Sequence, residues 1–97
     1  MKKYYEAHVT FNSTNEIYYP TWKFSRIDGD PVLGKGIKMY LTKQFKETVT
    51  LQAIQEEMSV VSQHLYLMGG QPLRTKIELV VYDTKTIPEE LLQEPLN

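Results

Sequence analysis

Two short segments near opposite ends of the chain contain residue types that can bind or transform an anionic group. The first is the triplet His8-Val9-Thr10, which follows Glu6. The second is the run Arg74-Thr75-Lys76-Ile77-Glu78. Side chains alternate between the two faces of a β-strand, so each segment would present its polar residues on one face. Together these faces offer imidazole, hydroxyl, guanidinium and ammonium groups, which donate the hydrogen bonds that phosphate oxygens accept.

The strands that must position these segments are predicted from alternation and turn residues. Residues 4–11 are rich in Tyr, Val, Thr and Phe and form the first expected strand, followed by a loop at 12–20. Two further strands are expected at 21–27 and 36–45, joined as a hairpin by a tip dense in Asp and Gly. The last strand is expected at 73–82.

One amphipathic helix is predicted between the third and the last strand. Its apolar residues recur at spacings of three and four: Leu51, Ile54, Met58, Val61, Leu65 and Met68. Thr50 is the expected N-cap, and Gly69-Gly70 is the expected left-handed end.

This order of elements predicts an α+β fold, in which one helix covers one face of a small antiparallel sheet. The arrangement resembles a ferredoxin-like fold whose first helix is reduced to the loop at 12–20. We therefore expect the first and last strands to lie side by side in the middle of the sheet. Ile77, Leu79 and Val81 would then contribute to the core.

Composition indicates a single domain at 1–83 and an acidic C-terminal tail at 84–97, which either forms a short helix or frays. The net charge of -1 argues against general coating of nucleic acid. No apolar run is long enough for a membrane span, and the absence of cysteine excludes disulfides and thiolate metal sites. We expect a cytoplasmic protein.

Three further motifs have ordinary structural explanations. Asp28-Gly29-Asp30 begins like a calcium loop but lacks the required Glu, so a hairpin turn is favoured. Gly34-Lys35-Gly36 is not a phosphate-binding loop, although Lys35 on a flap would reach an anion. His64 lies at the margin of the helix stripe, as a boundary residue does. We therefore expect neither a metal ion nor a cofactor.

If the first and last strands are neighbours, one contiguous set of polar side chains forms on the open face of the sheet. The candidate ligand-binding residues are Glu6, His8, Thr10, Lys38, Tyr40, Arg74, Lys76 and Glu78. Two interpretations stay open. The charged residues are a cross-strand ladder worth about 0.2–1 kcal/mol per pair, or they bind a ligand. For His8 the two interpretations are a hydrogen-bonded surface residue, or an imidazole that acts as an acid, a base or a hydrogen-bond donor to phosphate.

The His8-Val9-Thr10 triplet resembles half of the active site of the 2H phosphoesterase superfamily, the LigT-like cyclic phosphodiesterases. Those proteins carry two such motifs on paired strands, and the two imidazoles act as acid and base. Only one motif is present here, since His64-Leu65-Tyr66 does not match. A pair would require a second copy across a dimer axis.

A wider resemblance covers roughly residues 4–83. The segment Tyr5-Glu6-Ala7-His8-Val9-Thr10, the hairpin with its glycines, the helix and the run Arg74–Glu78 resemble a family of small uncharacterised bacterial and phage proteins. The resemblance implies that His8 and the Arg74–Glu78 segment belong to one site, and it implies no activity.

We predict that the domain binds a phosphorylated small molecule, with a nucleotide as the best candidate, on the open sheet face. Arg74 and Lys76 would neutralise phosphate, His8 and Thr10 would donate hydrogen bonds, and Tyr40 would stack on a base. Two alternatives remain. One is phosphodiester hydrolysis with His8 and Thr10 as catalytic residues, which is less favoured than non-catalytic binding. The other is an interaction or assembly subunit that forms a homodimer.

Overall fold

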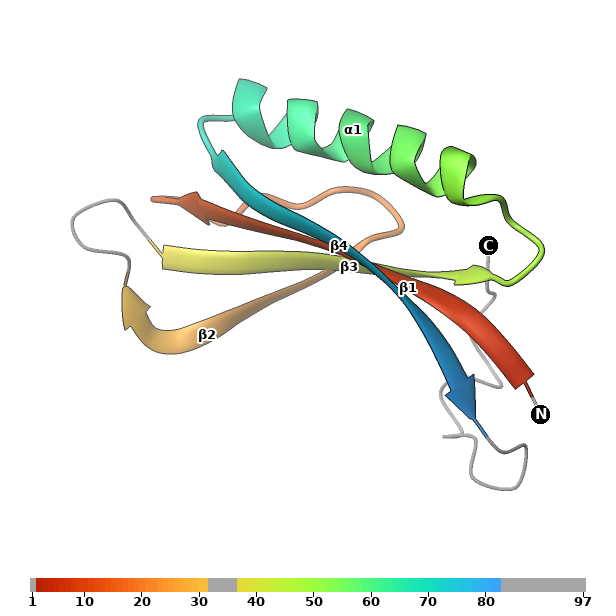
Figure 1. The fold of residues 1–97 in the computed structure, drawn as a ribbon. Helices are drawn as coiled ribbons and strands as arrows, with labels where there is room; N and C mark the ends of the chain where they lie inside the picture. Colours follow the sequence, from red (N-terminus) through yellow and green to blue (C-terminus); the bar gives the residue numbers. More distant parts are fainter. Residues whose placement is uncertain (1, 32–36, 83–97) are drawn as a thin grey trace.

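Four strands and one helix form two layers in the computed structural model (Figure 1). The structure describes the backbone of residues 2–31 and 37–82, and the side chains of residues 2–26 and 37–82. The elements are β1 (Lys2–Ser13), β2 (Lys23–Pro31), β3 (Ile37–Lys46), α1 (Leu51–Leu67) and β4 (Gln71–Tyr82). α1 lies across one face of the sheet, and no described element covers the other face (Figure 1). The predicted α+β class is confirmed.

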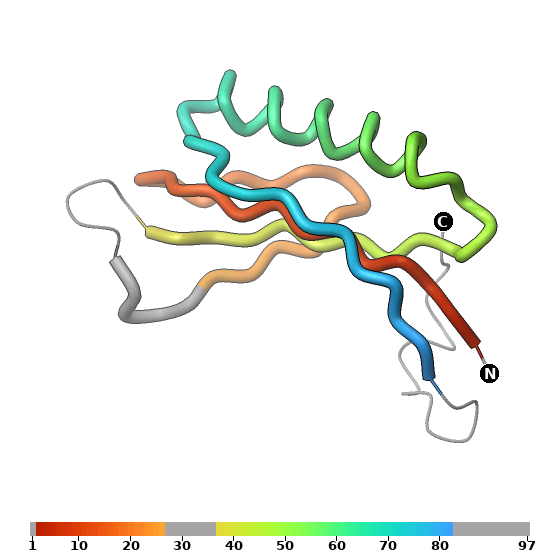
Figure 2. Tube along the Cα trace, in the orientation of Figure 1, coloured from red at the N-terminus to blue at the C-terminus, as the bar shows by residue number. Residues whose placement is uncertain are grey.

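The strand order is β2-β3-β1-β4, and each neighbouring pair is antiparallel. This is a ferredoxin-like arrangement in which a loop connects β1 to β2 where the first helix would be. β1 and β4 run side by side, as predicted (Figure 2). The prediction that β4 lies in the middle of the sheet was wrong. The other side of β1 is paired with β3, so β4 is an edge strand of the described sheet.

The core lies between α1 and the sheet face that α1 covers. Ala7, Val9 and Phe11 alternate along β1 and are fully buried. Met39 and Leu41 occupy the equivalent positions on β3, opposite Phe11 and Val9. The helix contributes Ile54, Met58, Val61 and Leu65, and the β1–β2 connection adds Ile17 and Trp22. Alternation in the strands and the helical period therefore meet on one buried surface.

Both ends of α1 have the predicted caps. Thr50 Oγ1 accepts a hydrogen bond from the Ala53 amide at 3.1 Å. The Gly70 amide donates to the Leu65 carbonyl at 2.8 Å and the Gly69 amide to the Tyr66 carbonyl at 3.1 Å, which is a Schellman motif. Gly69 adopts φ 90°, and a Cβ on Gly70 would lie 2.9 Å from Ile17 Cδ1. The two glycines thus turn the chain tightly into β4.

Four predicted core residues are exposed. Leu51 and Met68 lie at the two ends of the helical segment, where the stripe runs past the sheet. Leu79 and Val81 have the same parity as the half-buried Ile77, but that end of β4 extends away from α1 (Figure 1). In each case periodicity identified the face that points toward the core. The residues are exposed because the element that would cover them does not extend as far as the apolar pattern does.

The hairpin also differs from its prediction. β2 continues through the expected turn residues to Pro31, which is paired with Ile37 across an irregularity after Arg26. Glycine and proline are tolerated in strands at such irregularities. Lys35 and the tail at 84–97 lie outside the described residues. Within the part of the chain that is described, no helix is both long and apolar enough to cross a membrane.

Candidate functional site

Strand pairing brings the two predicted segments together on the open face of the sheet. β1 is the central element, because it pairs with β3 on one side and with β4 on the other. His8 lies opposite Thr42 of β3 and opposite Lys76 of β4. Thr10 in turn lies between Tyr40 and Arg74. The juxtaposition predicted from alternation is therefore present.

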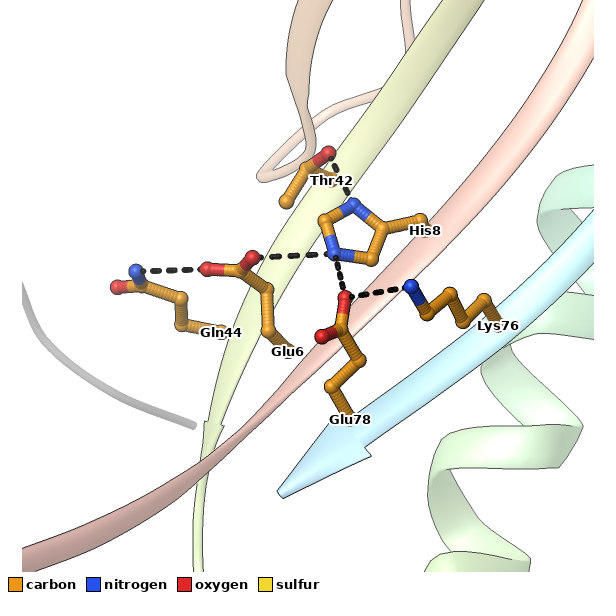
Figure 3. A network of polar contacts seen from close by, with 6 residues as sticks. All are labelled: Glu6, His8, Thr42, Gln44, Lys76 and Glu78. Atoms are coloured by element: carbon orange, nitrogen blue, oxygen red, sulfur yellow. Dashed lines mark hydrogen bonds and ion pairs between the residues drawn. The ribbon is translucent and has the colours of Figure 1, made fainter. Parts of the chain in front are cut away.

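His8 is held on three sides by polar side chains (Figure 3). Its Nδ1 lies 3.0 Å from Thr42 Oγ1. Its Nε2 lies 3.0 Å from Glu6 Oε1 and 3.2 Å from Glu78 Oε1. The His8 side chain is 24% exposed, so the ring edge is still reached from solvent.

A second set of contacts orients the two carboxylates (Figure 3). Gln44 Nε2 donates to Glu6 Oε2 at 3.3 Å, which leaves Oε1 of Glu6 directed at His8. Lys76 Nζ lies 3.3 Å from Glu78 Oε1, the same oxygen that faces His8. Each carboxylate is therefore fixed by a neighbour on an adjacent strand or on its own strand.

An open depression of about 220 Å³ lies beside this network. Its lining consists of six of the eight predicted site residues: His8, Thr10, Tyr40, Arg74, Lys76 and Glu78. The other two are outside the lining. Glu6 contacts the lining residue His8, and Lys38 is opposite Asn12, one same-face position beyond Tyr40.

A β-bulge lies at the Arg74 end of the depression. The β1–β4 register changes between Thr10, paired with Arg74, and Phe11, paired with Pro72. Leu73 is therefore the extra residue on β4. Bulges redirect side chains and are common beside binding sites. Here the bulge separates Arg74, which faces the depression, from Pro72, which is paired with a core residue.

The charges in the depression are unevenly paired. Lys76 contacts Glu78, whereas Arg74 has no ion pair among the described residues. Arg74 is exposed, so its guanidinium is available to a ligand in the depression. A guanidinium next to the Thr10 hydroxyl and the Tyr40 ring provides a charged donor, a neutral donor and an aromatic surface.

Tyr4 and Tyr82 lie at the other end of the open face. Their ring centroids are 5.3 Å apart. Burial, followed by the nearby Glu6 carboxylate and Tyr82, raises the pKa of the Tyr4 hydroxyl. Tyr4 therefore remains a neutral hydrogen-bond donor throughout the physiological range of pH.

Thr42, Gln44 and Asn12 also lie on this face, although they were not among the predicted site residues. Thr42 and Gln44 share the parity of Tyr40 on β3, so alternation alone would have included them. Asn12 follows Thr10 on β1 and is buried, and its Oδ1 has no hydrogen-bond partner among the described residues. Their position on the same face as the predicted residues is the sequence signal that could have identified all three.

His64 does not join the site. It lies on α1, on the covered side of the sheet, and its ring packs edge-on against Tyr19 with centroids 5.0 Å apart. His64 is half-buried, as expected of a boundary residue. The chain therefore provides one imidazole to the open face, not two.

A larger hollow of about 640 Å³ lies between α1 and the edge strand β4. It is lined by Gln55, Met58, Ser59, Ser62, Thr75, Lys76 and Ile77. Lys76 is its only charged residue, and it has no aromatic ring. The hollow is larger, but the smaller depression is the better candidate for a site that binds a charged ligand. Several hydrogen-bond donors line the depression together.

Comparisons of the chain with protein-family models, with curated proteins and with solved structures give no match. The site is therefore interpreted from its own chemistry.

Proposed function

We propose that the open face of the sheet binds a phosphorylated small molecule, with a nucleotide as the best candidate. The observation that carries the proposal is the lining of the depression, where Arg74, Lys76, Thr10 and Tyr40 surround one volume. Arginine and lysine bind phosphate oxygens, and an aromatic ring beside them accepts a base or another planar group.

The contacts of His8 refine its role in this proposal. Both ring nitrogens already have partners, so His8 acts as the support that holds Glu6 and Glu78 rather than as the main phosphate donor. Direct contact with phosphate is then made by Arg74, Lys76 and Thr10. Lys38 is placed to meet only a longer ligand, since it lies outside the lining.

Phosphodiester hydrolysis is weaker as a proposal on these observations. The 2H mechanism uses two imidazoles, and His64 is on the opposite side of the sheet from His8. A hydrolase would therefore require His8 of a second copy of the chain. Such an enzyme would lose all turnover in His8→Ala.

A homodimer is a second candidate because of the edge strand. β4 is 12 residues long, and Leu73, Leu79 and Val81 on it are exposed. Long edge strands with exposed apolar residues readily pair with another chain. Light scattering over a range of concentrations tests this: a dimer that Leu79→Lys dissociates supports it, and a monomer at all concentrations excludes it.

A thermal-shift panel tests ligand binding. The panel contains inorganic pyrophosphate and mono-, di- and cyclic nucleotides, measured with the wild type and with Arg74→Ala/Lys76→Ala. A ligand at 100 times its Kd adds about 2.7 kcal/mol of stability, which raises Tm by several degrees in a domain of this size. We expect this shift in the wild type and its loss in the variant.

The matched control is Lys2→Ala/Lys3→Ala, which removes the same charge from exposed positions at the far end of β1. This control should retain the shift. An equal loss of the shift in both double variants would mean that general charge, not the depression, attracts the ligand. Absence of a shift with every member of the panel would contradict the proposal.

A further inference from the structure

We propose that Glu6, His8 and Glu78 form a binding site for one divalent transition-metal ion. Each residue offers one donor atom, and the three donor atoms lie within 4.8 Å of one another. The two carboxylates come from β1 and β4, where Glu6 and Glu78 are directly paired. The sequence predicted no metal because it lacks cysteine and a calcium loop, and neither criterion detects donors assembled by strand pairing.

Two of the three distances between the donor atoms fit a metal centre. Nitrogen and oxygen ligands lie about 2.0–2.2 Å from Zn²⁺, so neighbouring ligands of one ion are roughly 3.0–3.6 Å apart. His8 Nε2 lies 3.0 Å from Glu6 Oε1 and 3.2 Å from Glu78 Oε1. A small adjustment of the glutamate side chains admits an ion between the three atoms.

The orientation of the His8 ring favours a cation at Nε2. When Thr42 Oγ1 accepts the Nδ1 hydrogen, Nε2 presents its lone pair to two carboxylate oxygens. Three acceptors then converge on one point, and a cation at that point satisfies all three. Metal-bound histidines typically donate their second ring nitrogen to an oxygen in this way, which fixes the tautomer.

The remaining contacts of the two carboxylates are made by Gln44 and Lys76. Gln44 holds the second oxygen of Glu6 at 3.3 Å and leaves Oε1 for the ion. Lys76 lies 3.3 Å from Glu78 Oε1 and competes with the ion for that oxygen. Because the Lys76 side chain is 48% exposed, its ammonium can leave when a metal binds. It would then be available in the depression that it also lines.

The donor set selects the class of metal. One imidazole and two carboxylates suit Zn²⁺, Mn²⁺ and related ions, whereas Ca²⁺ takes six to eight oxygen ligands and Mg²⁺ prefers oxygen and water. Three protein ligands leave at least one coordination position open. His8 and Glu78 also line the depression, so that position faces the volume where an anionic ligand would lie. The metal site itself does not depend on the proposed function.

Calorimetric titration of the metal-stripped full chain with Zn²⁺, Mn²⁺ or Mg²⁺ alone tests the site. We expect one Zn²⁺ per chain and much weaker binding of Mg²⁺. Glu6→Gln and Glu78→Gln should each weaken Zn²⁺ binding at least tenfold, and Thr42→Val should weaken it by a smaller factor. His64→Gln and the exposed Glu47→Gln are matched controls that should bind as the wild type does.

Two further readouts separate loss of the site from loss of the fold. Circular dichroism of the metal-free variants should show the wild-type spectrum, because glutamine keeps the size of the side chain and removes one of two neighbouring negative charges. Substoichiometric Mn²⁺ should broaden amide NMR signals most strongly around Glu6, His8 and Glu78, and less with increasing distance from them. Zn²⁺ binding that persists in Glu6→Gln/Glu78→Gln, or that disappears in His64→Gln, would overturn the proposal. Failure of the folded wild type to bind Zn²⁺ or Mn²⁺ at millimolar concentration would do the same.

Discussion

The two faces of the sheet each carry a small polar cluster, and the clusters differ in how their charges are matched. On the covered face, Glu57 Oε2 accepts from Trp22 Nε1 at 2.9 Å and from Lys43 Nζ at 2.6 Å. One carboxylate there meets one ammonium and one indole. On the open face, two carboxylates converge on His8.

This difference indicates what each cluster does. The covered cluster is complete within the chain, and Lys43 additionally lies 5.1 Å from the centre of the Phe45 ring. A complete, partly buried cluster between the helix and the sheet stabilises the packing of α1. The open cluster has two carboxylates for one ammonium, Lys76, so it is suited to an additional cation.

The largest effect is expected for the covered face. Phe11→Ala removes a fully buried ring between β1 and α1 and should lower the free energy of unfolding by about 3–5 kcal/mol. Urea denaturation followed by circular dichroism measures this. Lys76→Ala on the open face is the comparison and should change stability by no more than about 0.5 kcal/mol. Similar losses for both would contradict the division between the faces.

The next effect concerns the covered cluster itself. Glu57→Ala removes the acceptor of both Trp22 and Lys43 and should cost about 1.5–3 kcal/mol, because it leaves a nearly buried ammonium without a partner. The same urea experiment measures the loss. The control is Glu56→Ala, one residue earlier on the exposed side of α1, which should be close to neutral. Equal stability of the two variants would show that the covered cluster does not hold the helix.

A smaller effect tests the aromatic surface of the depression. Tyr40→Ala should weaken nucleotide binding by roughly 1 kcal/mol through loss of stacking, while binding of pyrophosphate stays unchanged. Calorimetry with both ligands measures the difference. Tyr66→Ala on the exposed side of α1 is the control, since that ring is far from the depression. Parallel losses for nucleotide and pyrophosphate would mean that Tyr40 does not contact a base.

The smallest effect is expected for the open cluster in metal-free protein. Glu78→Gln should leave the free energy of unfolding within about 0.5 kcal/mol of the wild type, or raise it slightly, because it relieves repulsion between two carboxylates. A loss of more than about 1.5 kcal/mol in urea denaturation would indicate that the contacts of His8 with Glu6 and Glu78 stabilise the fold. The open cluster would then be structural.

Local patterns were sufficient for most of the fold. Alternation in β1 assigned Val9 to the core and His8 to the open face, and the helical period assigned Ile54 and Val61 to the buried stripe. Such patterns report which face is apolar, and they do not report how far the packing partner extends. For this reason Leu79 and Val81 were wrongly expected in the core.

The site required information that local patterns lack. Glu6 and His8 are two residues apart, so their proximity followed from the strand. The contacts of His8 with Thr42 and Glu78 depend on the register of β3 and β4 against β1, and they join residues 34 or more positions apart. The predicted adjacency of the first and last strands was sufficient to place His8 near Glu78. The register of β3 against β1 was not predicted, so Thr42, the partner of His8 Nδ1, was missed.

An NMR titration of the ¹⁵N-labelled protein with pyrophosphate and with a nucleotide shows which face of the sheet binds the ligand, because it reports each face separately. We expect chemical-shift changes at the residues that line the depression, with the amides of α1 unchanged: His8, Thr10, Tyr40, Arg74 and Lys76. Changes centred on Gln55, Ser59 and Ser62 would instead place the ligand in the hollow between α1 and β4. Either that result or the absence of any change would contradict the claim that the open face is the binding surface.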